Sequence, residues 1–115
     1  MKRVALLFLI SMAILQGNSL KCEKKNNTIT CTYFSDRSDN PNGIKLKFDW
    51  ISPISPQDDR IRYIEIPPYY GSAYDYRFLP GRAIGKWRVV VTRTDNNETI
   101  QSSFEINATD DEFFN

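Results

Sequence analysis

Three asparagines stand in the Asn-x-Ser/Thr pattern that protein N-glycosylation requires. They are Asn26, Asn97 and Asn107, and each is followed two positions later by threonine. In an exported chain, an exposed side-chain amide in this pattern is chemically competent to accept a glycan. The sequence therefore predicts three candidate modification sites, provided that the chain leaves the cytosol.

Two of these sites carry an acid two residues before the asparagine, Asp95 before Asn97 and Glu105 before Asn107. This pattern resembles the extended acceptor sequon of bacterial protein N-glycosylation systems. Asn26 departs from it because Lys24 stands at that position, so we expect only a eukaryotic-type transferase to modify Asn26. The competing interpretation is compositional, since turns and chain ends are rich in asparagine, threonine and acids.

A second group of side chains with binding chemistry lies in the tyrosine-rich segment 67–76. Its candidate binding residues are Tyr69, Tyr70, Tyr74 and Tyr76. Tyrosines offer rigid, amphipathic contact surface at low entropic cost, which suits the binding of sugar rings, peptides or a protein partner. The competing interpretation is that these rings cover the open end of the fold and fill its core.

The two cysteines, Cys22 and Cys31, have a spacing that fits a disulfide across a hairpin. If Asn26 and Asn27 form a two-residue turn, the antiparallel register places Cys22 directly opposite Cys31. Export to an oxidising compartment makes a disulfide the expected state. Closing so short a loop stabilises a domain by about 2 to 3 kcal/mol on the chain-entropy model. A catalytic redox pair is the disfavoured alternative, because it needs an activated thiolate.

Several classes of active site are excluded by composition. The chain contains no histidine, so Ser-His, Cys-His and His-zinc sites are absent. The acids at 58–59 and 110–112 lack the alternating spacing of calcium loops. Glycoside hydrolysis needs a cleft flanked by two acids, which a sandwich of 96 residues rarely encloses. We interpret these acids as a solvated turn and an acidic tail. The sequence thus predicts a protein that is not an enzyme, with no catalytic residue, no metal and no cofactor.

The first nineteen residues have the pattern of a signal peptide. A basic start precedes an apolar run over 4–15, and the small residues Gly17 and Ser19 fit a cleavage site after position 19. The run is too short to span roughly 30 Å of hydrocarbon, so we expect no transmembrane anchor. The remaining 96 residues carry 13 basic and 14 acidic side chains, a balance that argues against nucleic-acid binding.

The segment 20–106 is organised as one β-sandwich domain, and 107–115 is expected to be a flexible acidic tail. Short stretches of alternating or β-rich sequence predict strands beyond the first hairpin, at 44–50, 60–66, 73–79, 86–94 and 98–106. The last two should form a second hairpin with Asn96-Asn97 as its turn, placing Asp95 opposite Glu98. About seven strands without an amphipathic helix favour two packed antiparallel sheets.

The later strands resemble those of bacterial immunoglobulin-like sandwich domains. The residues that carry the resemblance are Phe48-Asp49-Trp50-Ile51-Ser52-Pro53, Leu79-Pro80-Gly81, Gly85-Lys86-Trp87-Arg88-Val89-Val90-Val91 and Ser103-Phe104-Glu105-Ile106. The resemblance implies a small immunoglobulin-like β-sandwich. The chain departs from antibody-type domains because its disulfide joins a local hairpin and not two facing sheets.

These observations lead to one functional hypothesis and two alternatives. The first is an exported, non-enzymatic binding or assembly protein, periplasmic or on the surface of a Gram-negative bacterium, with a protein or glycan partner in the cell envelope and N-glycosylation of its own chain. The second is a small carbohydrate-binding module or carbohydrate-active enzyme that uses the tyrosines. The third is a secreted eukaryotic or viral immunoglobulin-like decoy.

Overall fold

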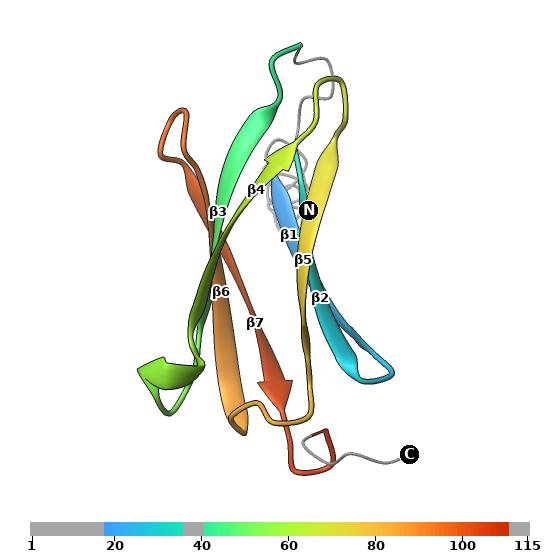
Figure 1. Cartoon of the computed structure of the whole chain (residues 1–115), viewed down its shortest axis with the longest axis vertical. Helices are drawn as coiled ribbons and strands as arrows, with labels where there is room; N and C mark the ends of the chain where they lie inside the picture. The colour runs from blue at the N-terminus through green and yellow to red at the C-terminus, as the bar shows by residue number, and fades with distance from the viewer. Residues whose placement is uncertain (1–17, 36–40, 111–115) are drawn as a thin grey trace, which may run out of the picture.

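The computed structural model describes residues 18–35 and 41–110, and it is a sandwich of two antiparallel sheets (Figure 1). The strands are β1 (Ser19–Lys25), β2 (Thr28–Phe34), β3 (Ile44–Ile51), β4 (Arg60–Ile66), β5 (Ser72–Phe78), β6 (Gly85–Arg93) and β7 (Thr99–Ile106), with a short 3₁₀ turn η1 at Pro56–Asp58. The expected all-β sandwich of seven strands is confirmed. Residues 1–17 of the expected signal peptide lie outside the described residues. Within those described, no helix is long and apolar enough to cross a bilayer.

The strand order follows an immunoglobulin-type arrangement. One sheet has the order β1-β2-β5 and the other β4-β3-β6-β7. In constant-type immunoglobulin domains the fourth strand pairs with the fifth, whereas here β4 pairs with β3 in the opposite sheet. As a result β4 and β5 are edge strands of different sheets that lie beside each other. On the other side of the sandwich, the edge strands β1 and β7 are also neighbours (Figure 1).

The first hairpin has the predicted register. Lys25 pairs with Thr28, and Cys22 pairs with Cys31. Asn26 adopts a φ of 57°, the left-handed conformation that asparagine tolerates in such turns. The Cys22 and Cys31 Cα atoms lie 4.0 Å apart and their sulfurs are bonded. The predicted disulfide is therefore confirmed, and its alignment follows directly from the length of the turn.

The core lies between the inner faces of the two sheets. The alternation of β3 buries one side of that strand completely, as its pattern predicts. The buried apolar side chains are Ile29, Cys31, Tyr33, Ile44, Leu46, Phe48, Trp50, Ile66, Leu79, Trp87, Val89, Val91 and Ile106. Trp87 stacks on the half-buried Phe104 with ring centroids 6.0 Å apart, so this end of the core is filled by aromatic rings.

The second hairpin has a register two residues away from the predicted one. Arg93 pairs across the loop with Glu98, donating its backbone N–H to the Glu98 carbonyl at 2.8 Å, and Trp87 faces Phe104. The predicted register would place the acids Asp95 and Glu98 directly opposite each other, which is repulsive. The longer loop instead lets Asp95 accept two hydrogen bonds from the Arg93 guanidinium. A slip of two residues leaves every side chain on its expected face.

The expected flexible tail begins with a closed turn over 107–110. Asp110 accepts a hydrogen bond from the backbone N–H of Asn107 at 3.0 Å and from Lys24 Nζ at 2.8 Å. Lys24 also donates to the carbonyl of Glu105 at 2.9 Å. These bonds attach the chain after β7 to the β1–β2 hairpin, because β1 and β7 are neighbouring edge strands. Residues 111–115 of the tail lie outside the described residues.

Candidate functional site

All four candidate tyrosines are exposed to solvent. The exposed fractions are 66% for Tyr69, 64% for Tyr70, 59% for Tyr74 and 45% for Tyr76. The interpretation that these rings fill the core is therefore wrong. Phe78, which is not among the predicted binding residues, is 62% exposed.

Three of the exposed rings form one row on the outer side of β5. Tyr74, Tyr76 and Phe78 alternate along the strand, and we call them the aromatic face. The rings of Tyr76 and Phe78 meet edge to face, with centroids 5.9 Å apart. The partner strand β2 places threonines opposite the same three positions, namely Thr32, Thr30 and Thr28. The face thus combines apolar rings with a ladder of hydroxyl groups.

Tyr69 and Tyr70 belong to a different part of the surface. They lie in the β4–β5 loop, where the Tyr70 N–H donates to the carbonyl of Pro67 at 3.0 Å and Tyr69 has a φ of 69°. This loop lies at the end of the sandwich where β5 begins, whereas Tyr76 and Phe78 lie towards the end of that strand (Figure 1). The structure therefore divides the four candidate tyrosines into two pairs. Tyr69 and Tyr70 lie in the loop, and Tyr74 and Tyr76 lie on β5.

The inner side of β5 carries charged residues where a core strand would carry apolar ones. Asp75 is 3% exposed and Arg77 is 9% exposed. Asp75 accepts a hydrogen bond from Trp50 Nε1 at 2.8 Å and one from Arg60 at 3.0 Å. Because its charge is paired and its carboxylate is hydrogen-bonded, Asp75 is tolerated inside the sandwich.

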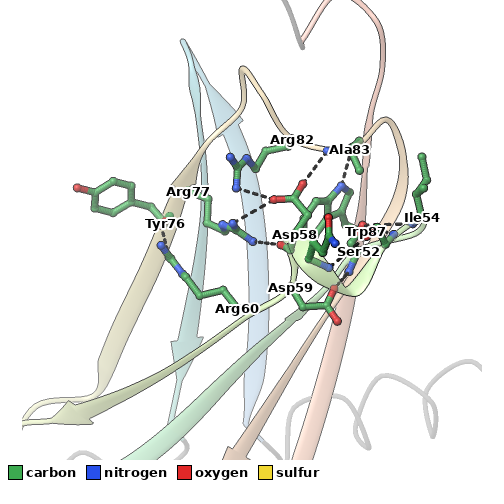
Figure 2. Close-up of polar contacts among 12 residues, drawn as sticks. Ser52, Ile54, Asp58, Asp59, Arg60, Tyr76, Arg77, Arg82, Ala83 and Trp87 are labelled. Atoms are coloured by element: carbon green, nitrogen blue, oxygen red, sulfur yellow. Dashed lines mark hydrogen bonds and ion pairs between the residues drawn. The ribbon is translucent and has the colours of Figure 1, made fainter.

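Asp58 is the second carboxylate of this buried network, and it is not the solvated turn residue that we expected. Its side chain is 18% exposed. It accepts hydrogen bonds from Arg82 at 2.7 Å, from the Ala83 N–H at 2.8 Å and from Arg77 at 3.3 Å (Figure 2). Arg77 also donates to the backbone carbonyl of Asp58 at 2.6 Å.

Local capping explains why Asp58 points into the network. Ser55 precedes η1, and its hydroxyl accepts the Gln57 N–H at 3.2 Å. The neighbouring Asp59 accepts the Ser52 N–H at 2.7 Å, which closes the β3–β4 connection from the other side (Figure 2). These bonds fix the shape of the β3–β4 loop, and the bonds that Asp58 accepts from Arg82 and Ala83 hold this loop against the β5–β6 loop.

Four arginines surround a cleft between the edges of the two sheets. The cleft has a volume of about 350 Å³. We call it the arginine cleft, and its lining residues are Arg60, Arg62, Tyr76, Arg77, Phe78 and Arg82. It adjoins the aromatic face because Tyr76 and Phe78 belong to both. Arg60 spans the gap between the sheets by donating to the Tyr76 carbonyl at 2.7 Å (Figure 2).

The electrostatics of the cleft disfavour further positive charge. Burial lowers the pKa of Arg77, and the neighbouring Arg82 guanidinium lowers it further. The Asp58 carboxylate opposes both effects. The Arg77 guanidinium lies 5.4 Å from the centroid of the Trp87 ring, a cation–π contact that stabilises the ion in this partly dry position.

Sequence reasoning missed the cleft because its arginines come from three separated segments of the chain. One signal was present: in Tyr74-Asp75-Tyr76-Arg77-Phe78 the charged and aromatic residues alternate strictly. Such a strand must bury either its charges or its rings. The choice depends on whether Asp58 and Arg60 lie near enough to pair with the charges.

The predicted glycosylation sites are placed at the surface. Asn26 and Asn97 are exposed turn residues with φ values of 57° and 61°, as their predicted hairpin positions imply. Asn107 is also exposed, although its side-chain oxygen accepts the N–H of Asp110 at 3.1 Å.

In the part of the chain that the structure describes, no three acids or cysteines are grouped in a way that could hold a metal ion.

Comparison with known proteins supports the fold and nothing more specific. No protein-family model matches the chain, and no curated protein matches it in sequence. Among solved structures, it is similar to the crystal structure of hypothetical protein PH1083 from Pyrococcus horikoshii OT3, with a TM-score of 0.50 and 8% sequence identity. The similarity covers 80% of this chain and 88% of that one, so the likeness extends over most of the sandwich.

Proposed function

We propose that this protein is an exported, non-enzymatic binding or assembly protein whose contact surface is the aromatic face of β5. The observation that carries the proposal is the row of Tyr74, Tyr76 and Phe78 on one edge strand, each at least 45% exposed. Aromatic rings clustered in this way lose unfavourable contact with water when a partner covers them, and they are common binding anchors.

Other features support a location in the cell envelope. The basic and apolar start of the chain has the pattern of an export signal. The Cys22–Cys31 disulfide suits an oxidising compartment. We therefore place the protein in the periplasm or at the surface of a Gram-negative bacterium, as a member of the bacterial immunoglobulin-like domains that its later strands resemble. The partner is a protein or glycan of the same envelope.

Site-specific photo-crosslinking in the native host tests this proposal. A crosslinking amino acid at Tyr74 should form an adduct with one envelope component. The same amino acid at Tyr63, which is 70% exposed on β4, is the matched control and should give no such adduct. Phe78→Ala should abolish the adduct formed from position 74. Equal adducts from positions 63 and 74 would contradict the assignment of the aromatic face.

A small carbohydrate-binding module is the second candidate. It is favoured by the threonine hydroxyls of β2 beside the aromatic face, since sugars bind to surfaces that combine ring stacking with hydroxyl hydrogen bonds. A panel of soluble glycans, followed by quenching of tyrosine and tryptophan fluorescence, tests it. If no glycan of the panel quenches the fluorescence, this candidate is eliminated. The proposed partner of the aromatic face is then a protein.

We further propose that Asn97 and Asn107 carry glycans in the native host. Their exposure and the acids that precede them support this assignment. Glycopeptide mass spectrometry of the native protein should find both sites modified and Asn26 bare. A glycan on Asn26 would instead support the alternative of a secreted eukaryotic or viral decoy.

A further inference from the structure

The arginine cleft carries more positive charge than its own carboxylates neutralise. Four guanidinium groups line it, and the carboxylates bonded to them are Asp58 and Asp75. The cleft therefore has an excess of two positive charges. Arginine does not lose its proton in proteins, so this excess persists at every physiological pH. An anion entering the cleft would relieve the repulsion among the arginines.

The cleft also has hydrogen-bond donors that the protein does not use. Arg62 lies 3.8 Å from Asp75, beyond hydrogen-bond distance, and its side chain is 53% exposed. A planar guanidinium presents its donors as a fork that matches the oxygens of carboxylate, sulfate and phosphate groups. Arg62 places such a fork at the rim of the cleft.

The shape of the cleft favours a compact ligand over an extended peptide. Its volume of about 350 Å³ is near the lower end of small-molecule sites, which range from about 300 to 1,000 Å³. A peptide strand could add to the edge of β5 only through its free backbone groups. The Arg60 guanidinium already occupies one of these, the Tyr76 carbonyl, at 2.7 Å. Strand addition is blocked at this position.

We propose that the arginine cleft binds an acidic sugar unit, whose carboxylate, sulfate or phosphate contacts the arginines while its ring packs against Tyr76 and Phe78. The inference rests on the proposed binding role of the aromatic face and names the class of ligand. Charge selects the anionic group, the volume limits the ligand to about one ring, and Tyr76 and Phe78 are the aromatic residues that line the cleft beside it.

Titration of the ¹⁵N-labelled, oxidised full chain by NMR tests the inference. Glucuronate and glucose 6-phosphate should produce saturable shifts of the Tyr76 and Phe78 amides and of the arginine Nε–H groups. Glucose, which lacks the charge, should bind at least about tenfold more weakly, the loss expected for one charge-assisted hydrogen bond. Inorganic sulfate, which lacks the ring, should also bind more weakly than glucuronate. Binding of glucose as tight as that of glucuronate, or of sulfate as tight as either acidic sugar, would overturn the assignment.

Substitution of the exposed arginine locates the binding. Arg62→Gln should weaken glucuronate binding about tenfold without loss of stability, because Arg62 makes no short contact in the network. Arg88→Gln is the matched control, since Arg88 is an exposed arginine on β6 outside the cleft. Equal weakening by both substitutions would show attraction to general surface charge and overturn the inference.

The two proposals fail in different ways. If glucuronate and glucose 6-phosphate produce no shifts while position 74 still crosslinks to an envelope component, only the acidic-sugar inference is wrong. If both sugars bind in the cleft while no adduct forms from position 74, the inference stands and the proposed envelope contact through the aromatic face is wrong.

Discussion

The Arg60 guanidinium lies 3.0 Å from the Asp75 carboxylate, and this ion pair joins the edge strands of the two sheets. On the opposite side of the sandwich, Lys24 joins the β1–β2 hairpin to the turn after β7. In both places a long basic side chain spans the gap between sheets that share no backbone ladder. Such pairs limit access to the open strand edges, which otherwise invite pairing with other chains.

Replacement of Asp75 by asparagine should destabilise the domain by about 2 to 4 kcal/mol, the range for removing one partner of a largely buried ion pair. The substitution keeps the shape of the side chain and leaves Arg60 without its anion. Glu65→Gln, an exposed acid on β4, is the control and should change the free energy of unfolding by less than about 0.5 kcal/mol. Urea unfolding followed by tryptophan fluorescence measures both. Equal stability of the two variants would show that the pair contributes nothing.

Removal of the disulfide by the double substitution Cys22→Ala and Cys31→Ala should lower the free energy of unfolding by about 2 to 3 kcal/mol. The bridge closes a short loop with a sequence separation of 9, and it restricts the unfolded chain more than it strengthens the folded one. Chemical reduction of the natural chain should give a similar loss in the same denaturant titration. A stable reduced protein with an unchanged midpoint would contradict this expectation.

Two glycines with positive φ should respond differently to alanine. Gly43 has a φ of 76°, and an added Cβ would lie 2.8 Å from the Ile66 carbonyl oxygen. Gly81 has a φ of 89°, and its Cβ would meet nothing within 4 Å. Gly81→Ala should therefore lower the free energy of unfolding through backbone strain alone, by about 1 to 2 kcal/mol. Gly43→Ala should lower it further, because the steric clash adds to the strain. Thermal unfolding of the two variants tests the order, which would be refuted if Gly81→Ala were the less stable.

The turn after β7 should make stability depend on acid pH. The backbone N–H of Asn107 and then the Lys24 ammonium lower the pKa of Asp110 below its usual 3.8. A carboxyl with a lowered folded-state pKa stabilises the protein above its unfolded pKa, and this contribution disappears as pH falls through the folded value. Asp110→Asn should therefore be less stable than the natural chain at pH 6, and the difference should close below pH 3.8. A difference that stays constant from pH 6 to pH 2 would exclude this linkage.

Local pattern was sufficient for much of the fold. Alternation over Ile44–Ile51 gives the buried side of β3, and the turn at Asn26 and Asn27 gives the disulfide register. These features depend on residues that are only a few positions apart in the chain, so they can be predicted from the local sequence. The second hairpin was misjudged by two residues because its register depends on loop hydrogen bonds and on the repulsion of Asp95 and Glu98, which a turn rule does not contain.

The sequence by itself determined the strands, their faces in one-sided segments, the disulfide and the exposure of the turn asparagines. It left the orientation of β5 open, because the alternation of aromatic and charged residues does not say which of the two sets faces the core. Only the tertiary structure decided it: Asp58 from one loop and Arg60 from β4 reach the charges of β5, so Asp75 and Arg77 can be buried with hydrogen-bonded partners of opposite charge. That choice turns the aromatic rings outwards and gathers the arginines around one cleft.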